Sequence, residues 1–344
     1  MTTPARVAIN GFGRIGRLFF RQAFGRPEIE IVAINDLGDL ENLAYLLEYD
    51  SAYRTYEKTV TIDAASHSLV VDGKQIKVLQ EKDPAQLPWK SMNIDVAVES
   101  TGFFESFEKA KVHLTAGAKR AVITAPAKDE DGPEGRTILM GVNDDAMKTC
   151  PLTSNGSCTT NSATPVIQVF SENPGIVKAM LSTVHAYTAT QSLTDSPVRG
   201  GKDFRRGRAA SQNIVPETTG AAVAVTRVIP ELVGKFGGVA FRVPVVTGSL
   251  SNIVFLAKRK TSVEEINDIL KAAAALPRWQ GILKVTEEQL VSSDIIGQPF
   301  GAIVDLSFTK VIDGDLVQVL SWYDNEFGYV STLVRHVLHA VSTL

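Results

Sequence analysis

Residues 11–16 of this chain, Gly-Phe-Gly-Arg-Ile-Gly, decide the fold predicted for its N-terminal half. They follow a short apolar run over residues 6–10, typical of a buried strand, and lead into a helical pattern over residues 17–24. A second apolar run ends in an acid, Asp36, 20 residues after Gly16. Three glycines at this spacing between a strand and a helix, with an acid closing the next strand, indicate a Rossmann dinucleotide-binding domain with a doubly wound, mainly parallel sheet.

Each part of this pattern has a physical role. The glycines permit a tight turn, a close approach of the backbone to pyrophosphate, and tight packing of helix on strand. The pyrophosphate would lie at the helix N-terminus, where N–H groups and the helix dipole favour an anion. Asp36 would accept hydrogen bonds from the adenosine ribose and repel a 2′-phosphate, so the sequence predicts NAD rather than NADP. The glycines alone would also fit an ordinary turn, but the flanking strands, helix and acid favour the nucleotide site.

The alternation of strands and helices continues along the first half. Residues 94–99 and 120–124 have strand patterns and flank a helical pattern over residues 106–116. Small and hydroxyl residues follow both strands, and a doubly wound sheet holds its cofactor at the carboxyl ends of its strands. Residues 59–78, with an Asp-Gly turn, predict a β-hairpin insertion.

The second half of the chain predicts an α+β domain. Long β-type runs are interleaved with helical stretches, one of which contains Pro165 and is expected to kink there. The expected strands are residues 177–184, 238–246, 249–257, 303–308 and 316–322, and the expected helices are residues 159–170, 219–229, 263–275 and 329–344. This order favours a catalytic domain over residues 158–324 with a mixed, largely antiparallel sheet. The first domain then spans residues 1–157 and is completed by a C-terminal helix, residues 325–344.

The composition describes an ordinary globular protein and argues against several function classes. Over 344 residues, the net charge of −3 gives no electrostatic footprint for nucleic acid or an anionic membrane. Apolar runs fall short of the ~20 residues that a membrane-spanning helix needs, and the first residues lack the apolar segment of a signal peptide. Two cysteines are too few for a disulfide framework. We therefore expect a cytoplasmic protein in a reducing compartment, without a metal site.

One of the two cysteines, Cys158, lies in a polar run over residues 154–161, at an expected strand-to-helix turn. His185 follows the next expected strand. A thiolate is a better nucleophile than a thiol, and a helix N-terminus or a charged histidine stabilises it. The alternative, a small buried cysteine, fits poorly among Ser, Thr and Asn side chains. Cys158 and His185 are therefore the candidate nucleophile and base.

Hydroxyl and basic residues of the second half suit an anionic ligand. Residues 218–222, Thr-Thr-Gly-Ala-Ala, open a helix and offer hydroxyls and an N-terminal dipole. Arg242 is a charge inside an apolar strand, and Arg205 and Arg208 lie in a basic cluster. A structural ion pair for Arg242 and a solvated face for the other two are open alternatives. A phosphate-bearing ligand would engage all three guanidinium groups.

These motifs occur together with several others in one family. The matching stretches are residues 10–17, 33–36, 99–102, 157–161, 183–188, 219–222, 241–244 and 322–329. They span nearly the whole chain in the family's order, and the cysteine stretch and the Trp-Tyr-Asp-Asn-Glu stretch are highly specific. The chain thus resembles the phosphorylating glyceraldehyde-3-phosphate dehydrogenases.

The resemblance implies a reaction in two halves. The Cys158 thiolate would attack glyceraldehyde 3-phosphate to give a hemithioacetal, with His185 as general base. Hydride transfer to NAD would leave a thioester, which inorganic phosphate would release as 1,3-bisphosphoglycerate. The backbone N–H of Cys158 and the His185 side chain would stabilise the oxyanion.

The resemblance also implies the binding residues. For NAD they are Gly11, Gly13, Arg14, Ile15, Gly16, Asp36, Lys82, Thr101, Thr124, Asn325, which would bond the carboxamide, and Tyr329, which would pack beside the nicotinamide. For the substrate's own phosphate they are Thr188, Thr190 and Arg242, and for the attacking phosphate they are Ser157, Thr159, Thr219, Gly220 and Arg205. Residues 187–208 resemble the family's S-loop, which reaches a neighbouring subunit's cofactor in a homotetramer. The basic cluster then has a role without nucleic acid.

Four positions depart from the family's pattern. Ser162 replaces a second cysteine that catalysis does not need, and Lys82 replaces an arginine near the adenine. Ser196 is typical of NADP-tolerant relatives and opposes the preference expected from Asp36. We favour Asp36, because its charge opposes a 2′-phosphate directly. Residues 245–248, Val-Val-Thr-Gly, replace Thr-Pro-Asn-Val and would alter the sugar-phosphate pocket or a subunit contact.

Competing functions are distinguished by single features of the sequence. Erythrose-4-phosphate dehydrogenase shares the cysteine, the histidine and the cofactor domain, but its relatives lose the phosphate signature kept at residues 219–222. Aspartate-semialdehyde dehydrogenase would lack residues 322–329 and this cysteine stretch. A non-enzymatic role in RNA or protein binding is disfavoured by the net charge. Replacing Cys158 with Ser would abolish turnover in an enzyme and leave a binding module unaffected.

Overall fold

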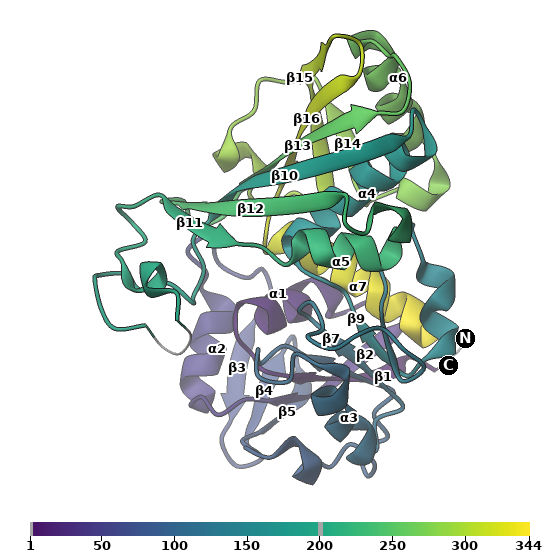
Figure 1. The fold of residues 1–344 in the computed structure, drawn as a ribbon. Coiled ribbons are helices and arrows are strands. Elements are labelled where there is room, and N and C mark those ends of the chain that lie inside the picture. Colours follow the sequence, from purple (N-terminus) through teal and green to yellow (C-terminus); the bar gives the residue numbers. More distant parts are fainter. Residues whose placement is uncertain (1–2, 199–201) are drawn as a thin grey trace. The chain divides into compact units, whose positions relative to one another are not determined.

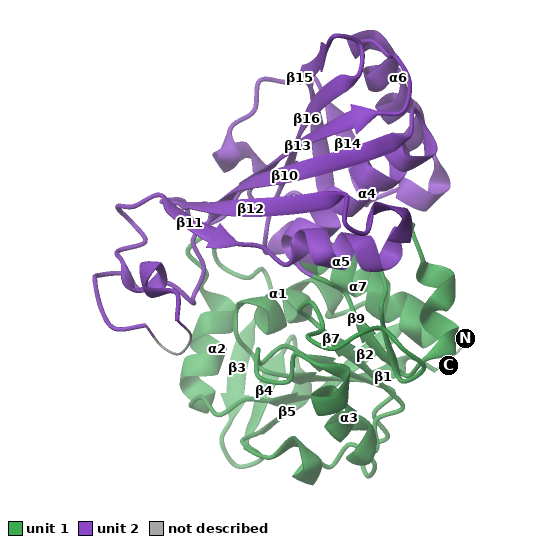
Figure 2. Cartoon of the chain, in the orientation of Figure 1, with its two compact units in different colours: residues 1–156, 330–344 green, residues 157–329 purple. Residues whose placement is uncertain are grey.

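The chain folds into two compact units in this computed structural model, which describes residues 3–198 and 202–344. Unit 1 contains the residues up to Gly156 together with Val330–Leu344, and unit 2 is Ser157–Tyr329 (Figures 1 and 2). Residues 325–329, which we assigned to the C-terminal helix of the first domain, group with unit 2. A physical reason is that the Asn325 side chain is hydrogen-bonded to Ser249 and Thr247 of that unit.

Within the described residues, unit 1 contains a nine-stranded sheet with the order β3-β4-β5-β2-β1-β6-β7-β9-β8. The strands are β1 (Ala5–Asn10), β2 (Ile29–Asn35), β3 (Val60–Asp63), β4 (Ser68–Val71), β5 (Lys74–Leu79), β6 (Val96–Glu99), β7 (Arg120–Ile123), β8 (Gly135–Thr137) and β9 (Leu152–Ser154). The strands from β5 to β8 in this order pair in parallel, which confirms the predicted doubly wound, mainly parallel sheet. Chain order reverses at β1, which lies between β2 and β6, and such a sheet binds its ligand at that point.

The segment predicted as a hairpin insertion forms three strands. β3 pairs with β4, and β4 pairs with β5, both antiparallel. The turn between β4 and β5 lies at Asp72 and Gly73, which both have positive φ. β5 then pairs in parallel with β2 and so extends the main sheet. The hairpin pattern was therefore part of a larger element than expected.

Unit 1 contains three complete helices and most of a fourth. They are α1 (Arg14–Ala23), α2 (Leu40–Glu48), α3 (Phe107–Thr115) and α7 (Phe327–Ser342), of which α7 enters unit 1 at Val330. Asp39 caps α2 by accepting from two backbone N–H groups, and Ser106 caps α3 in the same way with one. β6 and β7 are buried along their whole length, as expected for central strands of a parallel sheet.

Unit 2 contains, within its described residues, a seven-stranded sheet with the order β11-β12-β10-β13-β16-β15-β14. The strands are β10 (Ile176–Ala186), β11 (Val215–Thr218), β12 (Phe236–Val243), β13 (Ser249–Ala257), β14 (Leu283–Thr286), β15 (Ala302–Ile312) and β16 (Leu316–Tyr323). β10 with β12 and β14 with β15 are parallel, and the other neighbours are antiparallel. The predicted mixed, largely antiparallel sheet is therefore confirmed.

The helices of unit 2 are α4 (Cys158–Glu172), α5 (Ala221–Val228) and α6 (Val263–Ala274). α4 contacts β10, β13, β15 and β16, and it continues well beyond Pro165. Short 3-10 helices occur at Pro84–Gln86 (η1), Asp144–Thr149 (η2), Phe204–Gly207 (η3), Pro230–Leu232 (η4), Pro277–Trp279 (η5) and Ser292–Ile295 (η6). In neither unit do the described residues form a helix long and apolar enough to span a membrane.

Candidate functional site

The glycine motif of unit 1 is shaped by backbone crowding. Gly11 has φ +93°, and a Cβ there would lie 2.6 Å from the backbone N of Thr101. A Cβ on Gly16 would lie 2.1 Å from the carbonyl oxygen of Gly11, so only glycine lets α1 pack this closely on β1. Gly13, by contrast, has open space around its Cβ position. The two crowded glycines and the open one fit a phosphate group approaching the backbone at the N-terminus of α1.

Asp36 is held in place beside this motif. One carboxylate oxygen accepts from the backbone N–H of Phe12 at 2.7 Å, and the other accepts from that of Gly38 at 2.8 Å. The side chain also borders a cavity of about 280 Å³, whose other lining residues include Gly11, Gly13, Lys82, Thr101 and Phe103. Gly11, Gly13, Asp36, Lys82 and Thr101, five of the eleven residues predicted to bind NAD, therefore line one cavity at the carboxyl ends of β1, β2 and β6.

A buried polar network that we did not predict supports Thr101. The Glu99 carboxylate is buried and accepts from Asn10 Nδ2 at 2.6 Å, from His113 Nε2 at 2.9 Å and from the backbone N–H of Thr101 at 2.8 Å. Trp89 Nε1 donates to His113 Nδ1 at 3.2 Å, so the proton of this histidine lies on Nε2. The sequence signal for this network was Glu99, an acid at the end of an otherwise apolar strand.

The other predicted cofactor residues have different surroundings. Arg14 is ion-paired with Asp50 and lies over the Tyr53 ring, and neither Arg14 nor Ile15 lines the cavity beside Asp36. Thr124, at the end of β7, donates its backbone N–H to the carbonyl of Glu99 at 3.0 Å.

Asn325 belongs to unit 2 and has a fixed side chain. Its Oδ1 accepts from Ser249 Oγ at 2.8 Å and from Thr247 Oγ1 at 3.2 Å. Because Oδ1 of Asn325 accepts both of these hydrogen bonds, its amide nitrogen is left as the donor that a ligand would meet. The unusual Thr247 thus has a local role, because its hydroxyl also donates to the Asp324 carboxylate at 2.8 Å. Tyr329, predicted to lie beside the nicotinamide, is buried.

The predicted catalytic pair, Cys158 and His185, lies at the start of α4 and the end of β10. Cys158 is the first residue of this helix, and Ser157 caps it through a reciprocal pair of hydrogen bonds with Thr160. Cys158 Sγ lies 3.3 Å from His185 Nε2, at the end of β10. The first N–H groups of a helix have no partner within it, so Sγ sits where aligned donors favour negative charge. The structure therefore brings together the two residues predicted to act as nucleophile and base.

His185 is neutral, which corrects our expectation that its charge stabilises the thiolate. Burial and the positive charge of Arg242 lower the pKa of His185 to about 3. Nδ1 lies 2.7 Å from the carbonyl oxygen of Ala186 and 2.6 Å from Arg242 Nη1. When Nδ1–H donates to Ala186, Nε2 is free to accept the thiol proton; when Arg242 donates to Nδ1, the proton lies on Nε2 and faces Sγ.

Burial also raises the pKa of the Cys158 thiol, and the Arg242 charge opposes this effect. The positive charge that favours the thiolate therefore comes from Arg242 instead of His185. Tyr323 is a further neighbour that the sequence interpretation left without a role. Its hydroxyl is 3.0 Å from Thr159 Oγ1 and 2.7 Å from Thr183 Oγ1, and its ring packs edge-on against His185. Thr159, predicted to bind phosphate, is buried against this tyrosine.

Arg242 is held by an acid that sequence reasoning missed. Glu217 on β11 accepts from Arg242 Nε at 2.6 Å, and its other oxygen is ion-paired with Arg206. Arg205 instead pairs with Asp203 within its own turn, and Arg208 pairs with Asp195. The structural ion pair that we considered as an alternative for Arg242 is thus present. Its acid, Glu217, is also contacted by one arginine of the S-loop, and that arginine is Arg206.

The remaining predicted phosphate residues are hydroxyls and a glycine on loops and a helix start. Thr188 Oγ1 and Thr190 Oγ1 lie 2.9 Å apart. Thr219 Oγ1 accepts from the backbone N–H of Ala221 at 3.2 Å, and Gly220 is exposed at the N-terminus of α5. Ser157 Oγ is engaged by Thr160. The structure places these groups on the same unit as Cys158 and does not join them into one hydrogen-bonded cluster.

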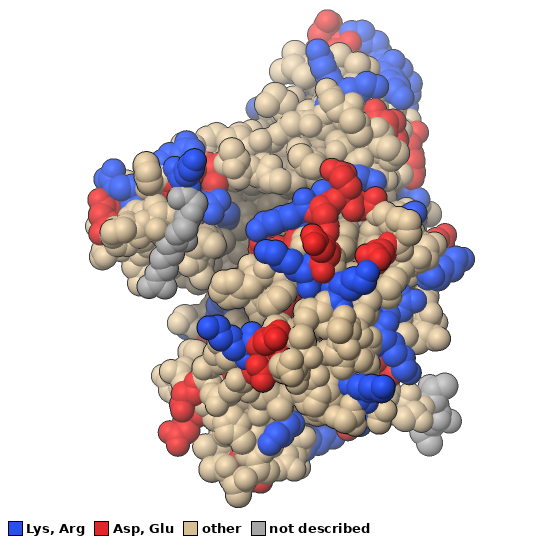
Figure 3. All heavy atoms as spheres, turned by 60° about the horizontal axis from the view of Figure 1, so that its bottom comes forward, with Lys and Arg blue, Asp and Glu red and all other residues tan. Residues whose placement is uncertain are grey.

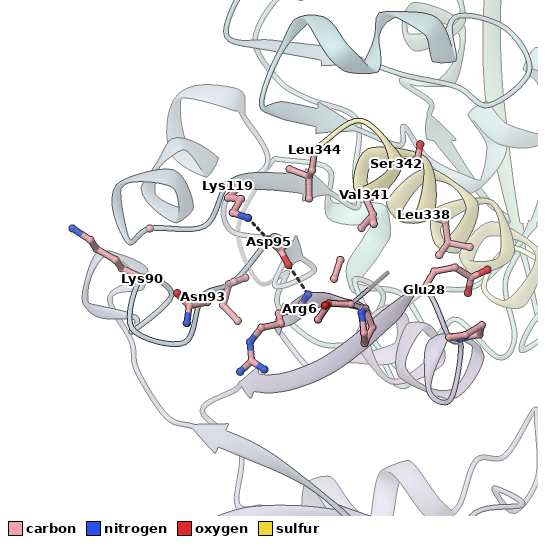
Figure 4. A pocket seen from close by; sticks show the side chains of 16 residues that line it. Arg6, Glu28, Lys90, Asn93, Asp95, Lys119, Leu338, Val341, Ser342 and Leu344 are labelled. Atoms are coloured by element: carbon pink, nitrogen blue, oxygen red, sulfur yellow. Dashed lines mark hydrogen bonds and ion pairs between the residues drawn. The ribbon is translucent and has the colours of Figure 1, made fainter. Parts of the chain in front are cut away.

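A larger hollow in unit 1 lies apart from the predicted residues (Figure 4). It measures about 1190 Å³ and is bordered by the amino end of β1, by Asp95 and by the end of α7. Asp95 accepts from the backbone N–H of Arg6 at 2.7 Å and pairs with Lys119 at 2.7 Å. None of the residues predicted to bind NAD or phosphate lines it, and it adjoins the wrong ends of the strands for a doubly wound sheet. We therefore exclude it from the candidate site.

Comparisons with known proteins agree over both units. Residues 5–107 match the family model described as "Glyceraldehyde 3-phosphate dehydrogenase, NAD binding domain", and residues 157–325 match that of the C-terminal domain of the same enzyme. A glyceraldehyde-3-phosphate dehydrogenase of Thermotoga maritima is 53% identical over 333 residues, covering 96% of this chain and 97% of that protein. One from Geobacillus stearothermophilus is 48% identical, covering 96% of each chain. This chain belongs to the glyceraldehyde-3-phosphate dehydrogenase family.

Proposed function

We propose that the protein oxidises D-glyceraldehyde 3-phosphate, with NAD and inorganic phosphate, to 1,3-bisphosphoglycerate in glycolysis and gluconeogenesis. The observation that carries this proposal is the pair formed by Cys158 Sγ and His185 Nε2, 3.3 Å apart at the N-terminus of α4. A thiol beside a neutral imidazole supplies the nucleophile and the base that attack on an aldehyde requires. Family membership and the nucleotide-binding unit supply the rest of the assignment.

Cys158 and His185 carry the proton and bond changes. The thiol proton passes to His185 Nε2 as Sγ bonds to the aldehyde carbon, and the resulting alkoxide takes the proton back to give a hemithioacetal. His185 then removes the hydroxyl proton while the carbon loses hydride, which leaves a thioester on Cys158. NAD, when bound, supplies the acceptor for that hydride. A phosphate oxygen finally attacks the thioester carbon, Cys158 leaves as thiolate, and one proton is released to solvent.

The same helix start serves the oxyanion. The backbone N–H of Cys158 belongs to the first turn of α4, where N–H groups lack helical partners. Together with Nε2–H of His185 it would donate to the oxygen that becomes negative during each attack. The low pKa of His185 keeps it in the base form between steps.

NAD is assigned to the edge of unit 1 that carries the glycine motif and Asp36. The residues proposed to contact it are those predicted from the sequence, including Asn325 through its amide nitrogen. The preference for NAD over NADP rests on Asp36, whose carboxylate is pinned by two backbone donors and cannot turn away from a ribose phosphate without losing them. Ser196, which favoured NADP, donates its hydroxyl to Ser192 Oγ at 2.8 Å within its own loop.

We assign two phosphate positions near the catalytic pair. Arg242 with Thr188 and Thr190 would hold the substrate's phosphate, and Ser157, Thr219 and Gly220 with an S-loop arginine would hold the attacking phosphate. The contact between Arg242 and His185 supports the first assignment, because the same imidazole ring contacts the Arg242 guanidinium on one side and Cys158 Sγ on the other. For the second, the S-loop arginine is Arg205, as the sequence predicted, and it is paired with Asp203 within its own turn.

A homotetramer is supported by the uncovered face of the unit 2 sheet. Along β10, Met180 is 60% exposed and Val184 is 40% exposed, while the alternate residues are buried under α4. Their cross-strand neighbours on β13, Val254 and Leu250, are also apolar. An apolar sheet face of this kind is typical of a surface that a second copy covers.

A cytoplasmic location and small-molecule substrates complete the proposal. Both cysteines are free thiols, which suits a reducing compartment. Nucleic acid is not favoured as a partner: on the face in Figure 3, Lys and Arg are interspersed with Asp and Glu, and the net charge is −3.

The deciding experiment is a steady-state assay with glyceraldehyde 3-phosphate, comparing NAD with NADP and the presence with the absence of phosphate. We expect turnover with NAD that depends on phosphate, and a lower kcat/KM with erythrose 4-phosphate. Turnover that phosphate does not accelerate would contradict the acyl-phosphate mechanism. A strong preference for NADP would mean that Ser196 outweighs Asp36.

A further inference from the structure

Glu217 lies between two guanidinium groups in unit 2. β11 pairs with β12 so that Val215 faces Arg242 and Glu217 faces Ala240, which makes Glu217 and Arg242 diagonal neighbours on one face of the sheet. One carboxylate oxygen accepts from Arg242 Nε at 2.6 Å, and the other is ion-paired with Arg206 of η3. The acid therefore ties the S-loop to the strand that carries Arg242.

Burial makes this arrangement costly unless every charge is compensated. The Glu217 side chain is 3% exposed and that of Arg242 is 16% exposed. A buried carboxylate with two guanidinium partners is well satisfied, whereas Arg242 alone beside His185 would be an uncompensated charge. Two arginines and one acid leave one positive charge in excess, which is available to an anion.

Both arginines keep donors for a ligand. Arg242 uses Nε for Glu217 and Nη1 for His185 Nδ1, and among the described residues no hydrogen bond engages its Nη2. Arg206 uses Nη2 for Glu217, its side chain is 39% exposed, and no hydrogen bond within the described part of the chain engages its Nη1. Unpaired donors on two guanidinium groups that share one carboxylate are suited to a phosphate group, which accepts several N–H bonds at once.

We propose that Glu217 is a positioning residue that fixes Arg242 and Arg206 as a paired clamp for the phosphate of the aldehyde substrate. This inference rests on the proposed function. Glu217 itself would not touch the substrate, because its two oxygens are occupied by the arginines. Its carboxylate sets the plane of the Arg242 guanidinium and keeps the two cations close despite their mutual repulsion.

The alternative is that the three charges only hold β11, β12 and η3 together. The two roles differ in what they predict for substrates with and without phosphate. A positioning role affects ligands that carry the phosphate more than those that lack it, although Arg242 also contacts His185, whereas a purely structural role affects Cys158 chemistry equally on any aldehyde. Glyceraldehyde 3-phosphate and glyceraldehyde are therefore the matched pair of substrates.

The test uses Glu217→Gln in the full-length protein, which keeps the side-chain shape and removes the charge. We expect kcat/KM for glyceraldehyde 3-phosphate to fall about tenfold or more, through KM, and that for glyceraldehyde to fall by a clearly smaller factor, because Arg242 also contacts His185. The control is Glu172→Gln, which removes a comparable but surface-exposed partner of Arg278 and should leave both substrates unaffected. An equal loss for both aldehydes, or a lower KM for the phosphorylated one, would overturn the proposal.

A binding measurement separates this inference from the proposed function. Calorimetric titration with sn-glycerol 3-phosphate, with glycerol as the control ligand, reports the clamp without turnover. We expect Glu217→Gln to weaken glycerol 3-phosphate binding about tenfold. If Glu217→Gln fails to fold, Arg206→Gln should weaken the same binding, and unchanged binding in that variant would overturn the clamp. A wild type that binds glycerol 3-phosphate but does not oxidise glyceraldehyde 3-phosphate would refute the proposed function alone.

Discussion

The acid–base chemistry of the site depends on the surroundings of His185. Burial removes the water that would stabilise an imidazolium, and Arg242 repels the added charge, so the ring stays neutral. Cys158 and His185 therefore form a thiol beside a neutral base. The positive charge belongs to Arg242, which contacts the other nitrogen of the imidazole, Nδ1. This arrangement keeps a proton acceptor available for both the thiol and the hemithioacetal hydroxyl.

Alkylation distinguishes the two cysteines. Cys158 should react with iodoacetamide at a single site per chain with parallel loss of activity, because its Sγ faces a base and a helix N-terminus. The matched control is Cys150→Ala: Cys150 is buried, burial raises the pKa of its thiol, and its Sγ donates to the carbonyl of Leu152. We expect Cys158→Ser to abolish labelling and turnover while NAD still binds. Full labelling of Cys158→Ser would contradict the assignment of the nucleophile.

Two buried histidines predict acid destabilisation. Burial lowers the pKa of both His185 and His336 to about 3, against an ordinary value of 6.5. The unfolded chain therefore binds these protons as the pH falls below 6.5, while the folded chain does not until about pH 3. The stability contribution is complete above pH 6.5 and is lost progressively down to about pH 3, at up to about 1.4 kcal/mol per pH unit for each histidine. Urea unfolding between pH 7 and 4 should show a shallower decline for His336→Asn than for wild type, and equal slopes would contradict this account.

Among the secondary-structure elements, the turn between β1 and α1 and the start of α4 are the two to which we assign the chemistry. Both place helix N–H groups where an anion is expected, pyrophosphate in one case and a thiolate or oxyanion in the other. They are built differently. The first relies on Gly11 and Gly16, where a larger residue would clash with the backbone, and the second relies on the Ser157 cap that fixes the first turn of α4.

Gly13 provides a test of the nucleotide turn that does not depend on folding. A Cβ at this position meets nothing within 4 Å, so Gly13→Ala should leave the melting temperature of the NAD-free protein unchanged. The added methyl group would occupy the space through which pyrophosphate approaches, and we expect NAD binding to weaken about tenfold or more. Fluorescence titration with NAD measures this. Gly132→Ala, at another open position of unit 1, is the control and should bind NAD normally. Normal binding by Gly13→Ala would place the pyrophosphate elsewhere.

At the level of the assembled protein, the uncovered face of the unit 2 sheet is the main unexplained surface. Residues on one side of β10 are buried under α4, and the other side carries the exposed apolar residues Met180 and Val184. A homotetramer would cover such a face and bring the S-loop to a neighbouring subunit, as the family resemblance implies. A single sheet face can serve only one contact, so further surfaces would complete a tetramer.

Charge placed on this face should reduce the assembly. We expect the double variant Met180→Lys and Val184→Lys to sediment as a smaller species than wild type, because two lysines would face their symmetry copies across an apolar contact. Analytical ultracentrifugation measures the change. Leu276→Lys alters an exposed apolar residue outside this face and should sediment like wild type. An unchanged mass for the double variant would exclude this face as a subunit contact.

Local sequence was sufficient for much of the fold and for the catalytic pair. Strand and helix periods, the glycine spacing and Asp36 predicted the parallel sheet of unit 1, and the polar run around Cys158 predicted the helix start at which it lies. These features depend on residues within a few positions of one another, where backbone geometry and capping act. The pairing of Cys158 with His185 was also expected, because Cys158 lies at an expected strand-to-helix turn, His185 follows the next expected strand, and both match one family.

Long-range contacts decided the electrostatics. Glu217, Arg206 and Tyr323 come from a short strand, a loop and a distant strand, and no local pattern predicted that they surround Arg242 and the catalytic pair. The same holds for Glu99 and His113, which meet through neighbouring elements of unit 1. The sequence by itself determined the fold class and predicted the nucleotide turn and the nucleophile, because these follow from short-range sterics and periodicity. Only the tertiary structure decided that His185 is neutral and that an acid shares two arginines, because burial and distance set the energy of a charge.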